Sequence, residues 1–221
     1  NIINDIEMQK TQLDHSMGRD MDDPESWRIF IHPTKGDENL ETNYIAYAEA
    51  ATVNYEAGFY YGSIDLEITT NEANSSIRYT TNGNLPFFAS SLYTGPITIS
   101  NTQVLKAIVY TTEPAILPSF ITFNTYFIDE DHSLPVVSTS ANQLTTLLNG
   151  NQSLRPHGTI EYFDVEGSRK DYGYGETINM ARILGPFLKE VLIISLGMKW
   201  VIMMQFMKNY LVFPIGMTSR E

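Results

Sequence analysis

Two short acidic runs are the stretches of this chain whose side chains could bind a metal ion. Residues 20–25 read Asp-Met-Asp-Asp-Pro-Glu, and residues 129–132 read Asp-Glu-Asp-His. The first run lacks the central glycine of an EF-hand calcium loop, and Ile31 stands where such a loop places its bidentate glutamate. We therefore predict solvated charged loops at both runs. A calcium site in the first and a surface metal site in the second are the alternatives.

No other pattern in the sequence points to catalysis. The four histidines, at positions 15, 32, 132 and 157, lack the spacing of zinc ligands, and the absence of cysteine removes thiolate chemistry and disulfides. Neither a G-x-S-x-G motif nor a glycine-rich phosphate loop occurs. Nothing in the sequence brings two acids together as a glycosidase requires. We predict that the chain itself is not an enzyme and needs no cofactor.

Aromatic residues near strand ends and loops are the candidates for a binding surface, because sugar rings stack on exposed aromatic side chains. The candidate carbohydrate-binding residues are Tyr60, Tyr61, Phe87 and Phe88, and Tyr55 and Phe59 are of the same kind. The alternative is that these rings cover the core or an edge of a sheet.

The charge balance limits the partners of the protein. The chain has 221 residues and a formal net charge of −12, so nucleic acid and anionic membrane surfaces would repel it. Its length allows one large domain or two small ones. We expect the partners to be neighbouring domains of the same polypeptide, with polysaccharide as a second partner.

The middle of the chain carries the pattern of short β-strands. Residues 63–69 alternate apolar and polar side chains, which places Ile64, Leu66 and Ile68 on one face of a strand. The sequence predicts further strands at residues 77–80, 97–99, 104–110 and 120–128. Turn residues separate them, among them the Asn82-Gly83 pair, which tolerates a positive φ angle. Tyr79 and Tyr93 are expected to pack beneath neighbouring strands.

These elements predict a mainly β protein whose centre, residues 58–128, is a small antiparallel β-sandwich of the immunoglobulin or fibronectin-III kind. Residues 1–40 are predicted to be irregular, and residues 41–57 to form a linker. Residues 134–180 are predicted to begin an incomplete α+β part, with a strand after Pro135 and a short helix at 141–148 capped near Ser140.

Residues 77–86, Ile-Arg-Tyr-Thr-Thr-Asn-Gly-Asn-Leu-Pro, carry the most specific motif of the chain. Together with Ser-Ser-Leu-Tyr-Thr-Gly-Pro-Ile at 90–97, they resemble the chitobiase C-terminal, fibronectin-III-associated domain. The sequence departs from that family at Phe87 and Phe88, where the family has a threonine and a polar residue. The resemblance covers about 70 residues and implies a non-catalytic β-sandwich.

Both flanks resemble other families more faintly. Residues 15–19, Trp27 and residues 33–39 are similar to the end of a lamin-tail-like domain, from which Pro24 and Lys35 depart. Residues 134–138, 160–164 and 173–180 look like the start of a CotH-type (spore-coat-protein-H-like) kinase domain, whose nucleotide and metal residues lie farther downstream.

These resemblances imply a secreted or cell-surface bacterial protein of several domains, of which this chain is an internal piece. We expect residues 58–128 to serve as a non-catalytic spacer or adhesion module. A carbohydrate-binding accessory module of a glycoside-hydrolase-like protein is one alternative, and a fragment of a secreted CotH-type kinase is another.

The last part of the chain, residues 181–221, differs in composition from the rest. It holds two of the 26 acidic residues, five of the 14 basic ones and five of the nine methionines. We interpret it as translated out of frame, since compatible codons read in another frame can encode a polar, acidic continuation. The alternatives are a membrane span, which Lys199 and Lys208 disfavour, and a buried helix.

Overall fold

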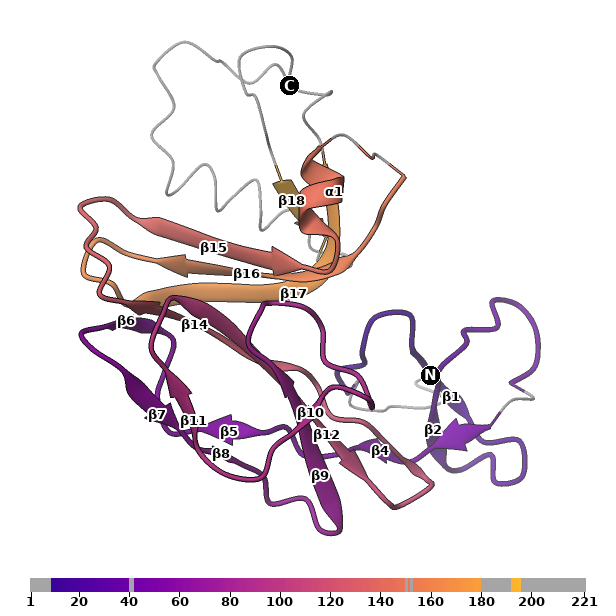
Figure 1. Cartoon of the computed structure of the whole chain (residues 1–221). Helices are drawn as coiled ribbons and strands as arrows, with labels where there is room; N and C mark the ends of the chain where they lie inside the picture. Colours follow the sequence, from indigo (N-terminus) through magenta and orange to yellow (C-terminus); the bar gives the residue numbers. More distant parts are fainter. Residues whose placement is uncertain (1–8, 40–41, 150, 152, 180–191, 196–221) are drawn as a thin grey trace, which may run out of the picture.

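The protein consists of a small N-terminal sheet, a β-sandwich and a C-terminal sheet that covers one face of the sandwich (Figure 1). The computed structural model describes residues 9–39, 42–149, 151, 153–179 and 192–195. Of residues 181–221, which we interpret as an out-of-frame tail, all but 192–195 lie outside the described residues. Among the described residues, no helix is long and apolar enough to cross a membrane.

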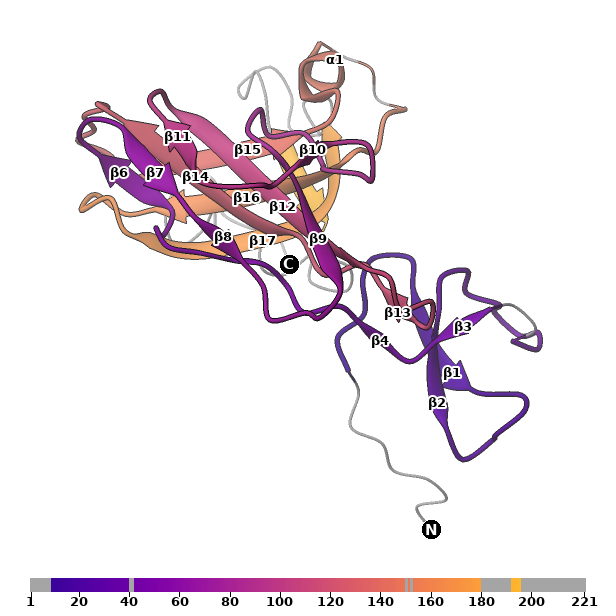
Figure 2. The same ribbon diagram turned by 60° about the horizontal axis from the view of Figure 1, so that its bottom comes forward.

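The N-terminal sheet contains three antiparallel strands, β1 (Ser16–Arg19), β2 (Trp27–Phe30) and β3 (Asn43–Tyr44). It lies beside one end of the sandwich (Figure 2). The last two residues of β2, Ile29 and Phe30, are buried. Residues 9–39, the described part of the segment that was predicted to be irregular, thus contain a β-hairpin whose turn includes the acidic run 20–25.

The first layer of the sandwich is a five-stranded sheet in the order β10-β9-β12-β14-β6. Its strands are β6 (Gly58–Tyr60), β9 (Ser75–Thr80), β10 (Ser91–Leu92), β12 (Gln103–Thr111) and β14 (Thr122–Ile128). All pairs are antiparallel except β14 with β6, which is parallel. The predicted strands in this region are thus present.

The second layer contains two strand pairs, β7 with β11 and β5 with β8. Their bounds are β5 (Thr52–Val53), β7 (Ile64–Leu66), β8 (Ile68–Thr69) and β11 (Ile97–Ile99). Ile64, Leu66 and Ile68 are buried while Asp65 and Glu67 are exposed, as the alternation predicts. The predicted β-sandwich is confirmed.

The core between the two layers is apolar and continuous. Its most deeply buried members include Leu66, Leu105, Val109 and Tyr126, and Tyr79 and Tyr93 pack against it as expected. The segment expected to be a linker contributes Ala48 and Ala51 to this core, together with β4 (Ala46–Tyr47), which pairs in parallel with β13 (Ile116–Leu117). Short alanines between polar residues give no period, so the sequence pattern could not show this burial.

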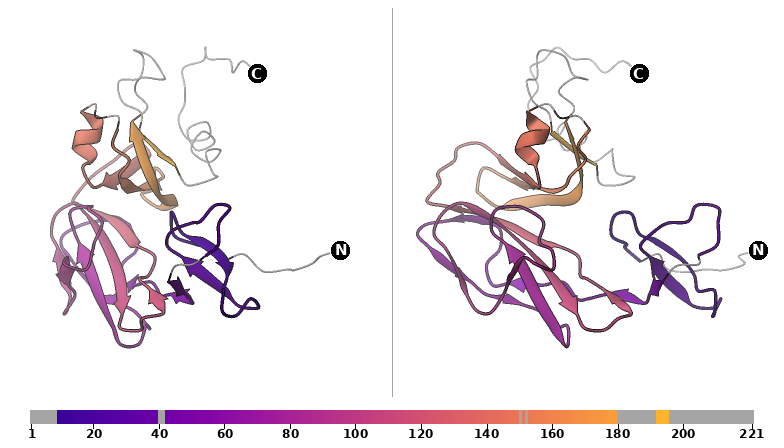
Figure 3. Two further views of the ribbon diagram at one scale, coloured as in Figure 1. Left: turned by 90° about the vertical axis from the view of Figure 1, so that its right-hand side faces the viewer. Right: turned by 45° about the vertical axis from the view of Figure 1, so that its right-hand side comes forward.

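The C-terminal sheet forms a third layer on the outer face of the five-stranded sheet (Figure 3). Its order is β15 (Val136–Ala141), β16 (His157–Phe163), β17 (Arg169–Asn179) and β18 (Leu192–Ser195). In β12, residues 105–109 are all buried, because one face of this strand meets the core and the other meets the third layer. A strand buried on both faces is the mark of a central layer.

The short helix α1 (Leu144–Leu148) begins later than predicted, and Ser140 is not its N-cap. Gln143 precedes it in a left-handed conformation without a side-chain cap. Ser140 belongs to β15, and its hydroxyl is 2.7 Å from that of Thr159 on β16. The hydroxyl thus bonds across the sheet instead of capping the helix.

Replacing Gly83 with alanine is expected to lower the free energy of unfolding by about 2 kcal/mol. Gly83 has a φ angle of +77°, which strains a residue that carries a Cβ. An added Cβ would also lie 2.8 Å from the Cβ of Ser140, so it would clash with the third layer. Urea denaturation measures the loss. Gly95→Ala is the control, since open space surrounds that position, and an equal loss in both variants would contradict the prediction.

Candidate functional site

A buried polar cluster joins the sandwich to the C-terminal sheet. Lys106 on β12 and Thr125 on β14 point outward from the sandwich, and Glu161 on β16 meets them from the third layer. Lys106 and Glu161 are 0% and 1% exposed. Polar groups at such depth must find partners, because an unpaired one costs several kcal/mol.

Glu161 receives its hydrogen bonds from both layers. Its Oε1 accepts from the backbone N–H of Thr125 at 3.2 Å and from Nη1 of Arg169 at 2.8 Å. Its Oε2 accepts from the hydroxyl of Thr125. One carboxylate therefore binds β14 of the sandwich and the neighbouring strand of its own sheet.

Arg169, the first residue of β17, extends this bonding around the edge of β14. Its Nη1 also lies 3.1 Å from the carbonyl oxygen of Phe123 and 2.9 Å from Oδ1 of Asn124. Its guanidinium carbon is 4.6 Å from the centre of the Tyr172 ring. The arginine is held by a carboxylate, two oxygens of the sandwich and an aromatic face.

Lys106 completes the cluster. Its Nζ donates to the carbonyl oxygen of Ser140 at 3.1 Å. Burial lowers the pKa of Lys106 to about 8, and the negative charge of Glu161 offsets part of that fall. Because no solvent reaches this amine, the cluster is suited to holding two layers together and not to acting on a substrate.

An aromatic cluster lies beside the polar one in the same interface. Phe59 stacks on Phe127 with ring centres 4.3 Å apart, and the edge of each ring meets Phe163. The ring of His132 also stacks on that of Phe59, with the ring centres 4.1 Å apart. Phe59 therefore packs between the layers instead of presenting a surface for sugar.

The four residues proposed for carbohydrate binding lie in two separate places. Tyr60 is the last residue of β6 and Tyr61 follows it, whereas Phe87 and Phe88 lie in the loop between β9 and β10. The strands β6 and β10 are opposite edges of the sheet. Tyr60 packs against Tyr55 and the core, and its hydroxyl donates to the carbonyl of Glu56 at 2.7 Å. The four rings do not form one platform.

Phe87 and Phe88 are the more open pair, with 63% and 66% of each residue exposed. Phe88 is supported by the edge of the Tyr110 ring at 5.6 Å and by the guanidinium of Arg78 at 5.1 Å. Tyr61 is 84% exposed, but its hydroxyl donates to Asp131 at 3.0 Å. Exposed aromatic rings held by neighbours are suited to stacking on a ligand.

The second acidic run is an ordered loop. Asp129 accepts a hydrogen bond from the backbone of Gly62 at 2.8 Å, and Glu130 accepts one from the hydroxyl of Thr102 at 3.2 Å. In the first run, Asp20 pairs with Arg28 at 3.0 Å. Over the part of the chain that the structure describes, no group of three or more histidine, aspartate or glutamate side chains could hold a metal ion.

The buried polar cluster is not among the features predicted from the sequence. Its trace is a single charge in each of two otherwise apolar strand segments, Lys106 between Leu105 and Ala107 and Glu161 between Ile160 and Tyr162. A charge at such a position predicts a buried partner, but the pattern alone cannot say which one.

These features define a β-sandwich module whose outer face carries a second sheet. Residues 55–115 match the family model of the chitobiase/beta-hexosaminidase C-terminal domain, so the resemblance of this segment is confirmed. The match covers less than half of the chain and lies within the sandwich, and it does not extend to the lamin-tail-like or CotH-type flanks. Comparisons with curated proteins and with solved structures find no match.

Proposed function

We propose that the sandwich is a non-catalytic structural module that fixes the flanking segments of a secreted multidomain protein. The observation that carries this proposal is the buried bonding between the first and third layers, in which Glu161 accepts from Thr125 and Arg169 donates to oxygens of β14. A spacer that must hold its neighbour in one orientation needs such an interface, whereas a flexible linker does not.

The N-terminal side is also attached to the sandwich. The side-chain amide of Gln12 donates to the carbonyls of Pro118 and Ser119 at 2.9 and 3.0 Å. His15 stacks on Tyr47 and its Nδ1 is 2.8 Å from the tyrosine hydroxyl. Both ends of the module are thus bonded to the segment beside them, which supports a spacer that transmits orientation.

The Phe163→Ala variant tests this role. Phe163 is completely buried between the layers, and its loss removes the ring that meets Phe59 and Phe127. If the layers form one unit, calorimetry of the full chain shows a single transition that shifts down as a whole, by about 3–5 kcal/mol in unfolding free energy.

The control for this test is Val165→Ala, in the exposed turn of the same hairpin. It is expected to leave the transition in place. If calorimetry shows two separate unfolding transitions, and Phe163→Ala leaves the transition of the sandwich unchanged, the proposed structural role is overturned.

The resemblances of the flanks belong to the same proposal. A secreted parent protein with a lamin-tail-like domain before the sandwich and a CotH-type domain after it would give the module two neighbours to hold. A kinase parent requires that metal and phosphate ligands be encoded downstream of residue 180. Sequencing the surrounding gene tests this, and it also shows whether residues 181–221 are read in the natural frame.

A second candidate function, carbohydrate binding, is favoured by one observation, the exposure of Phe87 and Phe88 on a supported loop. We expect the Phe87→Ala/Phe88→Ala double variant to lose retardation by polysaccharide in affinity electrophoresis, because each stacked ring contributes to binding. Val137→Ala shortens another exposed apolar side chain, on β15, and is the control. If no polysaccharide slows the migration of the unmodified chain, this function is contradicted.

A further inference from the structure

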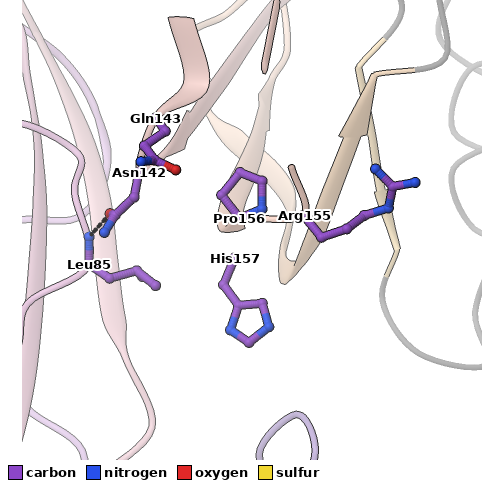
Figure 4. A pocket seen from close by; sticks show the side chains of 6 residues that line it. All are labelled: Leu85, Asn142, Gln143, Arg155, Pro156 and His157. Atoms are coloured by element: carbon purple, nitrogen blue, oxygen red, sulfur yellow. Dashed lines mark hydrogen bonds between the residues drawn. The ribbon is translucent and has the colours of Figure 1, made fainter. Parts of the chain in front are cut away.

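An open groove of about 480 Å³ lies where the sandwich meets the C-terminal sheet (Figure 4). It is lined by Leu85, Asn142, Gln143, Arg155, Pro156 and His157. Leu85 comes from the loop between β9 and β10, and the other five come from the third layer. The volume falls within the range of small-molecule sites, roughly 300–1,000 Å³.

The two walls of the groove are bonded to each other at one end. Oδ1 of Asn142 accepts a hydrogen bond from the backbone N–H of Leu85 at 2.7 Å, which fixes the carboxamide (Figure 4). The Nδ2 group of the same carboxamide carries two donor hydrogens. A fixed amide of this kind presents donors in a defined direction, as a binding site requires.

The remaining polar groups of the groove suit an uncharged ligand. Gln143 is exposed and adds a second carboxamide. His157 has its Nδ1 3.3 Å from the hydroxyl of Tyr174, which leaves Nε2 as the other polar edge of the ring. The guanidinium of Arg155 extends away from His157 (Figure 4), and the lining contains no carboxylate. Amides and an imidazole both donate to and accept from hydroxyl groups.

We propose that this groove binds a neutral sugar unit. The C–H surface of the pyranose ring lies against Leu85 and Pro156, and its hydroxyls bond to Asn142, Gln143 and His157. The proposal rests on the carbohydrate-binding candidate above and adds a site to it. Phe87 and Phe88 follow Leu85 in the same loop, so a glycan chain that stacks on them passes into the groove.

Such a ligand contacts the sandwich and the third layer at once. Because it binds only the folded arrangement, it stabilises that arrangement as its concentration rises above its dissociation constant. The groove therefore connects the two proposed functions, since occupancy strengthens the interface that fixes the orientation of the C-terminal sheet.

Nuclear magnetic resonance of the full chain tests the site, because the protein has only four histidines and their imidazole signals can be followed separately. Cellotetraose, xylotetraose and chitotetraose are the neutral probes. We expect at least one of them to shift the His157 signals in a saturable manner. The signals of His32, an exposed residue between β2 and β3 of the N-terminal sheet, are expected to stay in place.

Two variants locate the site. Gln143→Gly removes the carboxamide and suits the left-handed backbone, which has a φ angle of 56°, so this variant keeps the fold. His157→Phe keeps the ring and removes its nitrogens. Each is expected to weaken binding of the active tetrasaccharide at least tenfold, and Asn101→Ala, an exposed position elsewhere, is expected to leave it unchanged.

The outcomes separate the groove from the function on which it rests. If Phe87→Ala/Phe88→Ala abolishes binding while both groove variants bind like the unmodified chain, the groove proposal is overturned and carbohydrate binding stands. If the unmodified chain binds none of the tetrasaccharides and no polysaccharide, both are overturned.

Discussion

Replacing Arg169 with methionine is expected to lower the free energy of unfolding by about 3–5 kcal/mol, the cost of leaving a buried charge without its partner. Methionine keeps the length of the side chain and removes the guanidinium that lies 2.8 Å from Glu161. Glu161 is 1% exposed, so water cannot replace the lost donor. The oxygens of Phe123 and Asn124 lose the same donor.

Urea denaturation with linear extrapolation measures this loss, and the adjacent Lys170→Met is the matched control. Lys170 pairs with Asp164 at 2.8 Å on the surface, where solvent weakens the attraction, and its replacement is expected to leave the midpoint almost unchanged. A loss below about 1 kcal/mol in Arg169→Met would show that the buried pair does not hold the layers together.

A double-mutant cycle isolates the contribution of the pair. Glu161→Gln removes the charge and keeps an oxygen for Thr125, so Glu161→Gln/Arg169→Met is expected to be more stable than Arg169→Met alone. The coupling energy should reach about 1–3 kcal/mol, since both groups belong to one network. Additive losses would mean that the two side chains stabilise the fold independently.

Raising the pH from 8 to 10 is expected to increase the stability of the protein, and Lys106 is the physical reason. Burial lowers the pKa of Lys106 from 10.5 in the unfolded chain to about 8 in the folded one. Between these values the unfolded state binds the proton more tightly, so the free energy of unfolding rises with pH. The full difference corresponds to about 3 kcal/mol.

Two tyrosines set the upper limit of this window. Burial raises the pKa of Tyr126 and of Tyr174 from 10.0 to about 12. Their contribution to stability is complete below pH 10 and is lost as the pH rises toward 12. Urea unfolding at pH values from 7 to 11 should therefore show a rise up to about pH 10 and a fall above it.

The Lys106→Met variant checks this assignment. It removes a buried cation that forms no ion pair with a carboxylate of the described residues, although the charge of Glu161 acts on it. We therefore expect the variant to gain about 1–2 kcal/mol at pH 7, even though Ser140 loses a hydrogen bond. The rise between pH 8 and 10 should disappear in the variant. If the rise persists, another group titrates in that range and the role given to Lys106 is wrong.

One face of this sandwich is covered by the third layer, which distinguishes it from a sandwich that is exposed on both faces. Phe127 would add exposed apolar surface if this face were free, and in the structure Lys106, Thr125 and Phe127 all contact the third layer. A sandwich with such an outer face depends on its C-terminal neighbour. The matched family segment, residues 55–115, contains Lys106 but ends before β14, which carries Thr125 and Phe127.

The amino-acid sequence alone determined the β-sandwich of this protein and its family resemblance. The alternation in residues 63–69 and the turn at Asn82 and Gly83 each depend on a few neighbouring residues. Such local patterns can be recognised without the tertiary structure. The exposure of Phe87 and Phe88 in a loop after a strand follows from the same local pattern. The placement of these two residues and of Tyr60 and Tyr61 at opposite edges of the sheet does not follow from it.

Only the tertiary structure decided which polar residues meet across the layers. Lys106, Thr125 and Glu161 come from three strands that are far apart in sequence, and their approach depends on the third layer lying on the outer face of the first. The same holds for the groove, whose walls come from residue 85 and residues 142–157. Burial by a distant segment leaves no period in the sequence, because the period of a strand records its own two faces and not what covers them.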